Sequence, residues 1–282
     1  MVRFKFFLAF FALLICVVGV AVAYFYWKKF AEPEIGVVAQ IEGTAEVLKE
    51  KPDLGKRHFD EAIELLEEGE LVSARDRLRY LMTYFPESKT FGEAKRVVGE
   101  VNLDLLISPI PQPKKTIYTV RRGDALVTIA RRNATTIDYI MRSNGKTTSL
   151  IYPDEELVVY PLDFRVEINL DDKVVTLFDG DLFFKEYEIV GTNLPPEVRA
   201  PTTTTIQEKV AWFGDRPLNF TDANYMNCSK WIRTGRIGLF LRAAKRDEEE
   251  NDSTSFGVKV SRADMEELFT ILRTGSKVAL VN

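Results

Sequence analysis

A proline-rich stretch divides this chain into two parts with different periodicities. Prolines occupy every second position from Pro109 to Pro113. Proline fixes φ and has no backbone N–H to donate, so neither a helix nor a central strand is expected to continue through this stretch. Apolar residues recur at helical spacing before it and alternate with polar ones from Phe164 onward. Residues 108–115 are therefore expected to form an extended linker.

The segment before the linker, residues 56–107, is expected to form three helices. A break at Gly69 separates the first two, the second ends before Pro86, and a third follows. The apolar positions that indicate them are Phe59, Ala62, Ile63, Leu65, Leu66, Leu71, Ala74, Leu78, Leu81, Phe91, Ala94, Val97, Val98, Val101 and Leu105.

The segment after residue 163 is expected to be mostly β. Two runs that alternate polar and apolar residues, 165–170 and 173–178, predict strands, and Asp179-Gly180 predicts a turn into a third strand at 182–190. With 282 residues, the chain has room for two or three such domains, each with its own core.

The N-terminus carries an apolar run without charges from Phe6 to Trp27. At 1.5 Å per residue, this run is long enough to span a hydrocarbon core about 30 Å thick. We expect residues 1–30 to form a transmembrane anchor, with residues 31–55 as a stalk. The alternative is a signal peptide cleaved after Ala21-Val22-Ala23, but the apolar run continues past that site. Either way, the rest of the chain is expected outside the cytoplasm.

Charge and composition exclude several classes of function. The formal net charge of -4 argues against a nucleic-acid partner, which would favour a basic face. The chain has two cysteines, Cys16 and Cys228, and one histidine, His58. These residues indicate neither a disulfide framework nor a metal site, and no cofactor is expected.

Residues 56–107 are similar to one tetratricopeptide unit. Ala62, Leu65, Ala74, Leu78 and Pro86 fall at the spacings of that repeat. A peptide-binding groove normally needs several stacked repeats, so a plain helical spacer is the alternative. The resemblance implies that residues 56–107 could bind a protein partner.

Residues 116–162 resemble a LysM module of β-α-α-β form. The resemblance rests on Tyr118-Thr119-Val120, Gly123-Asp124-Ala125-Leu126, Ile129-Ala130, Asn144, Pro153-Asp154 and 157–161. Asp124 is expected to cap the first helix with its carboxylate. LysM modules bind the N-acetylglucosamine backbones of peptidoglycan or chitin between two loops. The resemblance places those loops at Gly123, Asp124, Ala125, Leu126 and at Leu150, Ile151, Tyr152, Pro153. Ala125 replaces a frequent threonine. The alternative is a LysM fold that serves only as a structural adaptor.

Residues 163–282 resemble an L,D-transpeptidase, the cysteine enzyme class that cross-links peptidoglycan. The likeness includes the Asp-Gly turn, Gly191-Thr192, the proline of Ala200-Pro201-Thr202, the run 236–241, and a last helix and strand from Ser261 to Val281.

The residues that the family uses for catalysis are replaced. The family motif Ser-His-Gly-Cys-Ile-Arg corresponds to a run that begins Ser255, Phe256, Gly257, Val258, and Lys259 falls in that run in place of the arginine. An upstream histidine corresponds to Phe240. Acyl transfer by this class needs a thiolate and a base, and phenylalanine and valine supply neither. The domain is therefore expected to be inactive.

Other residues could in principle replace the lost nucleophile. Cys228 is the one thiol outside the N-terminal run, and Ser255 is a weaker nucleophile still. An acidic run at 247–252 is expected to be a solvated loop, with a docking patch for a basic partner as the alternative. Trp212 and Trp231 are expected in the core rather than stacked on sugars.

Together these features predict an α+β multidomain protein: a transmembrane helix, a short repeat-like helical segment, a LysM module and an L,D-transpeptidase-like domain. The expected function is peptidoglycan binding in the bacterial cell envelope, with the last domain as a scaffold. The expected location is the inner membrane, crossed once, with the bulk in the periplasm, or secretion after cleavage. The rival hypothesis is an active L,D-transpeptidase with an unconventional nucleophile.

Overall fold

The computed structural model describes residues 20–31, 53–214, 216–225, 228–244 and 256–282. The chain divides into two compact units, residues 1–52 and 53–282. In the first unit, residues 20–26 are helical and continue into the π-helical turn η1 (Trp27–Ala31). Among the described residues, no helix is both long and apolar enough to cross a membrane. The predicted anchor and stalk lie mostly outside the described residues, so both stay predictions.

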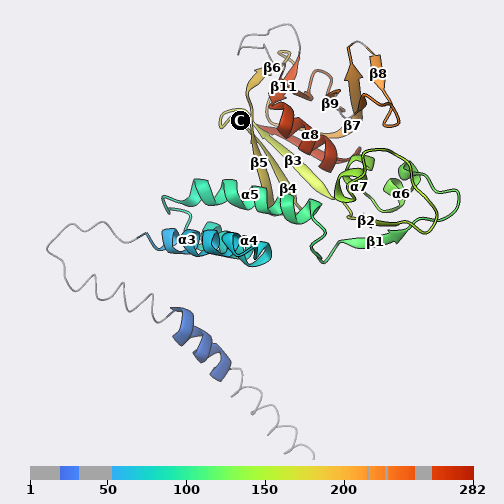
Figure 1. Cartoon of the computed structure of the whole chain (residues 1–282). Coiled ribbons are helices and arrows are strands. Elements are labelled where there is room, and N and C mark those ends of the chain that lie inside the picture. The colour runs from blue at the N-terminus through green and yellow to red at the C-terminus, as the bar shows by residue number, and fades with distance from the viewer. Residues whose placement is uncertain (1–19, 32–52, 215, 226–227, 245–255) are drawn as a thin grey trace, which may run out of the picture. The chain divides into compact units, whose positions relative to one another are not determined.

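The second unit begins with the three predicted helices, α3 (Leu54–Glu67), α4 (Leu71–Tyr84) and α5 (Phe91–Ile107) (Figure 1). Gly69 lies in the turn between α3 and α4 and has a positive φ of 81°. The helices therefore break where the sequence pattern predicted. Their small core contains Ala62, Leu78, Leu81, Ala94 and Val98.

The predicted linker does not form a free spacer. Residues 108–114 follow bends and a turn rather than an extended path. The Lys115 ammonium donates to the carbonyl oxygens of Leu105, Ser108 and Ile110 at 2.8, 2.5 and 3.1 Å. Carbonyls at a helix C-terminus have no partner within the helix, and here the last residue of the linker, Lys115, supplies a donor. The prediction of an extended linker was wrong because this tertiary contact folds the stretch back on the helix end.

The next segment has the predicted β-α-α-β order. Strands β1 (Thr116–Thr119) and β2 (Glu156–Val159) pair antiparallel and enclose α6 (Leu126–Arg132) and α7 (Ile137–Ser143). Its core is separate from the others and consists of Val120, Leu126, Ile129, Ala130, Ile140, Met141, Leu157 and Val159.

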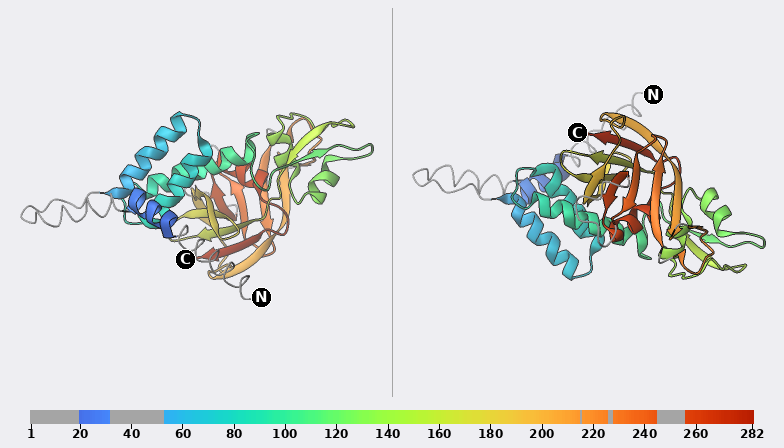
Figure 2. Two further views of the ribbon diagram at one scale, coloured as in Figure 1. Left: turned by 90° about the horizontal axis from the view of Figure 1, so that it is seen from below. Right: turned by 90° about the horizontal axis from the view of Figure 1, so that it is seen from above.

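The C-terminal region is one large sheet with a helix of its own against it. Its strands run in the order β5-β4-β3-β12-β7-β9-β10-β11-β6, with β8 beside β7. They are β3 (Phe164–Asn169), β4 (Val174–Asp179), β5 (Leu182–Glu188), β6 (Gly191–Asn193), β7 (Thr202–Phe213), β8 (Arg216–Leu218), β9 (Ser229–Thr234), β10 (Phe240–Ala243), β11 (Gly257–Val260) and β12 (Lys277–Val281). The helix is α8 (Arg262–Ile271). The predicted turn at 179–180 joins β4 to β5. Helices α3–α5 lie toward one end of this sheet and the β1–β2 segment toward the other (Figure 2).

Helix α5 covers the sheet at its edge strand β5. The side-chain amide of Asn102 donates to the Phe184 carbonyl oxygen at 2.7 Å. Lys185, buried on β5, pairs with Glu100 of α5 at 2.7 Å and with Glu267 of α8 at 2.8 Å. An uncovered edge strand would present unpaired backbone groups to other chains, and this helix removes that risk.

Helix α7 is fixed to the sheet and α8 through buried polar groups. Asp138 of α7 accepts a hydrogen bond from the Tyr225 hydroxyl at 3.0 Å and lies 3.5 Å from the Lys230 ammonium. Lys230 also pairs with Glu266 of α8 at 2.6 Å. The Thr136 hydroxyl donates to the backbone oxygen of Thr270. Polar contacts thus join α5 to β5, α5 to α8 through Lys185, and α7 to the sheet and to α8.

We expect Lys115→Ala to lower the free energy of unfolding by about 1–3 kcal/mol, because three carbonyl oxygens lose their donor. Chemical denaturation of the two proteins checks this. Lys114→Ala is the matched control. Lys114 is half exposed and pairs with Asp179 at 2.8 Å, a surface ion pair worth less than about 1 kcal/mol. Equal losses in both variants would contradict the proposed role of Lys115.

Candidate functional site

The structure brings the two predicted glycan loops together at one end of the β1–β2 pair. Val120 donates its backbone N–H to the Glu155 oxygen at 2.8 Å, and Asp154 donates to the Val120 oxygen at 2.9 Å. The first loop, residues 121–125, leaves β1 at the point where the second loop, residues 150–155, enters β2. Seven of the eight predicted residues therefore lie in two neighbouring loops, and the eighth, Leu126, begins α6.

Asp124 has a different role from the one predicted. Its carboxylate accepts from the Arg121 backbone N–H at 2.9 Å, the Tyr118 hydroxyl at 2.7 Å and the Arg132 guanidinium at 3.0 Å. These bonds hold the pKa of Asp124 below its ordinary value, and the one from the Arg121 N–H has the largest effect. The N-cap residue of α6 is Ala125, whose methyl side chain cannot accept a hydrogen bond. The N-cap prediction for Asp124 was wrong because the acid ties the loop to β1 instead.

The predicted residues differ in what they present to solvent. Leu126 is buried in the core of the segment, so its side chain is unavailable to a ligand. Gly123, Ala125 and Pro153 are exposed, and Ile151 is half-buried. The large apolar side chains of the site are Leu150 and Tyr152, exposed by 58% and 61%.

Sequence reasoning missed Glu155, which shapes the second loop. Its carboxylate accepts from the Tyr152 backbone N–H at 2.9 Å and pairs with Lys146 at 2.5 Å. Asp154 beside it has a φ of +68°, a left-handed conformation that permits the tight turn. The Pro153-Asp154 pair was the signal for this turn, but the contact to Lys146 is tertiary.

The positions that correspond to the catalytic residues also meet in space. Strands β10 and β11 are parallel neighbours, with Leu241 opposite Val258. Val258 is fully buried in the main core, whereas Phe256 is 52% exposed. Lys259 is buried. Ser255 and the acidic run 247–252 lie outside the described residues.

Gly257 shows how tightly the two strands pack here. Its φ is +124°, and an added Cβ would lie 2.9 Å from the Phe240 carbonyl oxygen. A side chain at this position would therefore clash with β10 as well as strain the backbone.

Three aromatic side chains lie next to one another across β7, β9 and β10. The ring centroids of Trp212 and Trp231 are 6.3 Å apart, and those of Trp231 and Phe240 are 6.5 Å apart. All three are partly buried, and neither tryptophan is among the residues of the main core, where they were expected.

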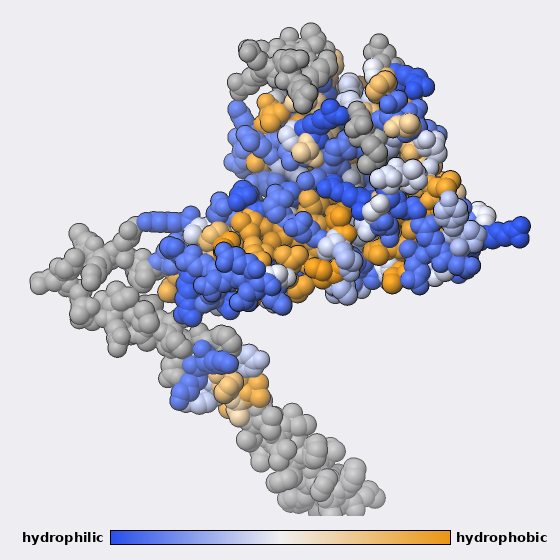
Figure 3. Space-filling model, in the orientation of Figure 1, coloured by the Kyte–Doolittle hydropathy of each residue, from blue (hydrophilic) through white to orange (hydrophobic). Residues whose placement is uncertain are grey.

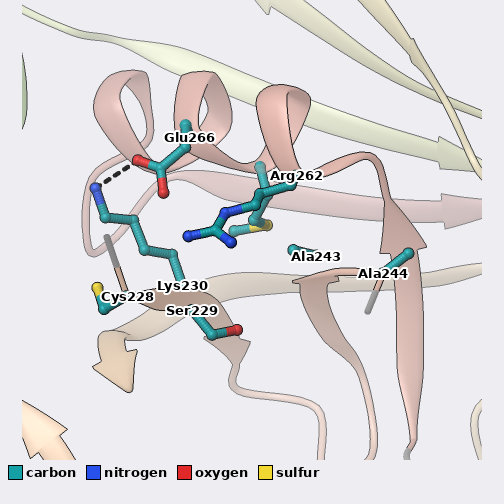
Figure 4. Close-up of a pocket in the computed structure, with 8 residues that line it drawn as sticks. Cys228, Ser229, Lys230, Ala243, Ala244, Arg262 and Glu266 are labelled. Carbon is teal, nitrogen blue, oxygen red and sulfur yellow. Dashed lines mark hydrogen bonds and ion pairs between the residues drawn. The ribbon is translucent and has the colours of Figure 1, made fainter. Parts of the chain in front are cut away.

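Cys228 lines a cavity of about 640 Å³ between β9, the end of β10 and α8. Figure 4 shows Lys230 and Glu266 joined across it, with Arg262 alongside. The thiol is buried and donates to the Tyr225 carbonyl oxygen at 2.9 Å. Burial raises the pKa of Cys228. A raised pKa disfavours the thiolate, which is the nucleophilic form.

Comparison with known families identifies residues 118–159 as a LysM domain, which confirms the predicted resemblance. No curated protein matches the sequence. The tetratricopeptide resemblance finds no support in these comparisons.

Solved L,D-transpeptidase structures resemble part of the chain. One from Stackebrandtia nassauensis is 14% identical with a TM-score of 0.33, over 43% of this chain and 56% of that one. One from Enterococcus faecium is 15% identical with a TM-score of 0.30, over 49% and 59%. One from Mycobacterium smegmatis is 8% identical with a TM-score of 0.32, over 46% and 64%. The chain thus covers somewhat more than half of each, and no activity follows from the likeness.

We expect Ala125→Thr to raise the free energy of unfolding of the LysM domain by about 1 kcal/mol. Ala125 has φ -130° and ψ 150°, the extended conformation in which a threonine hydroxyl caps a helix. Thermal denaturation checks this, with Ala125→Val as the control of the same shape. A gain in the valine variant as large as in the threonine variant would contradict capping as the cause.

The first loop is expected to loosen in acid. Because the native pKa of Asp124 lies below its ordinary value, its contribution to stability is present above about pH 3.9. The contribution is lost as the pH falls through the native pKa. NMR titration of the loop amides checks this, and Asp124→Asn should remove the acid-dependent change at the Arg121 amide. A loop that shifts equally with pH in the variant would assign the effect to another group.

Proposed function

We propose that this protein binds the glycan strands of peptidoglycan through its LysM domain. The observation that carries this is the pair of adjacent loops, 121–125 and 150–155, with exposed Leu150 and Tyr152 at their surface. Sugar rings have apolar C–H faces and polar edges, so they fit a site that combines exposed apolar side chains with backbone N–H and C=O groups. The repeating N-acetylglucosamine units of the wall are the proposed ligand.

We propose further that the C-terminal domain performs no acyl transfer. Transfer by an L,D-transpeptidase mechanism needs a thiolate beside a base. Val258 fills the predicted nucleophile position with a buried apolar side chain, and Phe240 fills the upstream histidine position. The remaining thiol, Cys228, is buried with a raised pKa. The domain would then serve as a scaffold for the LysM domain and the helices.

The proposed location is the bacterial cell envelope, with residues 1–30 as the anchor. A membrane anchor and a wall-binding domain in one chain would attach it at two points. Two-point attachment raises the effective concentration of each site for its ligand. Cleavage of the N-terminal segment would instead leave a secreted wall-binding protein. A protease-protection assay on intact spheroplasts, with an antibody to the C-terminus, distinguishes a periplasmic from a cytoplasmic location.

We expect Tyr152→Ala to weaken cosedimentation with purified peptidoglycan by about fivefold or more, as for an exposed aromatic at the centre of a contact. Tyr84→Ala is the matched control, because Tyr84 is 65% exposed on α4, outside the LysM domain. Equal loss in both variants, or no sedimentation of the unaltered protein, would contradict glycan binding at these loops.

Incubation of the protein with muropeptides, followed by mass spectrometry, is expected to leave the muropeptides unchanged. New cross-links or a covalent acyl-protein would favour the rival, an active enzyme with an unconventional nucleophile. In that case Cys228→Ala would test whether the buried thiol forms the bond. If the product persists in that variant, the nucleophile lies elsewhere.

A further inference from the structure

A groove lies where α4, the C-terminal half of α5, the former linker and the β4–β5 turn meet. Its volume is about 270 Å³. In Figure 3, hydrophobic residues line the strip that α5 occupies in Figure 1, between hydrophilic surfaces. Its apolar lining residues include Leu105, Leu106, Leu182 and Phe184.

The groove is positively charged in a chain that is negative overall. Its charged lining residues are Arg75, Arg79, Lys114 and Asp179, three positive and one negative, which gives +2. The whole chain has a formal net charge of -4. The one carboxylate is already bound, since Asp179 accepts from Lys114 at 2.8 Å and from the Tyr160 hydroxyl at 3.3 Å.

Neutral amides hold the two arginines in position within the groove. Arg75 donates to the Gln112 side-chain oxygen at 3.1 Å, and Arg79 donates to the Asn102 side-chain oxygen at 3.3 Å. Arg75 also pairs with Asp76, whose side chain is 61% exposed. Among the ion pairs of the described residues, none joins Arg79 to a carboxylate.

This arrangement opposes helix stability. Arg75 and Arg79 are four residues apart on α4, so their charges lie on the same face and repel each other. Burial, and then the charge of Arg75, lower the pKa of Arg79. Two partly buried guanidiniums that face one cavity form a ready site for an anion, and guanidinium binds carboxylates through paired hydrogen bonds.

The rest of the lining narrows the kind of anion. Leu105, Leu106 and Phe184 are buried at the floor, and Leu182 is 60% exposed at the start of β5. A small inorganic anion would leave this apolar surface uncovered. The volume falls just below the range of small-molecule pockets, so it suits the end of a chain rather than a long segment.

We propose that this groove binds the free C-terminal carboxylate of a partner polypeptide that ends in an apolar residue. The carboxylate lies between Arg75 and Arg79, and the last side chain lies against the exposed Leu182, above the buried floor. The proposal thereby specifies the protein partner predicted for residues 56–107 as one with a free C-terminal carboxylate and an apolar last residue. The inference does not depend on wall binding, and its test contains no peptidoglycan.

The test uses fluorescence anisotropy with the full chain and a labelled peptide that ends in alanine-leucine with a free carboxylate. We expect saturable binding that Arg79→Gln weakens by tenfold or more, the usual effect of losing a charge-assisted hydrogen bond. The same peptide with a C-terminal amide should bind at least tenfold more weakly. Arg57→Gln is the charge-matched control, because Arg57 is exposed on α3 and should leave affinity unchanged.

A second variant covers the case in which Arg79→Gln does not fold. Leu182→Asp places a negative charge at the exposed rim and should weaken binding at least as much. Equal binding of the amidated peptide, equal loss in Arg57→Gln, or no binding at about 1 mM peptide would overturn the proposal. Displacement by inorganic phosphate at lower concentration than by unlabelled peptide would also overturn it, by making the groove a phosphate site.

Discussion

The carboxylate of Asp138, whose side chain is only 11% exposed, fixes the LysM domain against the sheet. A charge removed from water must be compensated by opposite charges and hydrogen bonds. Asp138 is compensated by the Tyr225 hydroxyl, by Lys230 at 3.5 Å and by Lys209 at 3.9 Å. Burial lowers the pKa of Lys209 to about 8, against the opposing effect of Asp138. The compensation works only in one arrangement of α7, β7 and β9, so it specifies how the two domains meet.

Lysines that are buried (Lys185, Lys230) or half-buried (Lys115) recur at the junctions of this unit. Lys115 binds the end of α5, Lys185 joins α5 to α8, and Lys230 joins α7 to α8. A lysine has a long apolar stem and three donors on its ammonium. It can therefore cross an apolar layer and still reach carbonyl or carboxylate oxygens on a neighbouring element. The pieces that look separate along the sequence are joined by these side chains.

The sequence predicted the helices and strands well, but it predicted poorly the contacts by which they join one another. The helical spacing around Gly69 and the turn at 179–180 depend on local chemistry, and both are present in the structure. The extended linker and the cap at Asp124 were wrong because Lys115 and Tyr118 offered partners that local patterns do not reveal. The glycan loops were placed by resemblance, and the pairing of Val120 with Glu155 explains why they lie together. The arginine groove could not be foreseen, because its lining comes from five separated segments of the sequence.

The contacts at Asp138 fix the LysM domain relative to the sheet. Binding of a glycan strand to the LysM domain would therefore also set the orientation of the rest of residues 53–282. A domain on a flexible tether holds its ligand at any angle, whereas a domain locked by buried charges holds it at one. A glycan strand between residues 121–125 and 150–155 would therefore cross the protein along a fixed line. The arginine groove would face the same way relative to that strand in every copy of the protein. If many copies bound the same glycan strand, their arginine grooves would then all have the same orientation relative to that strand.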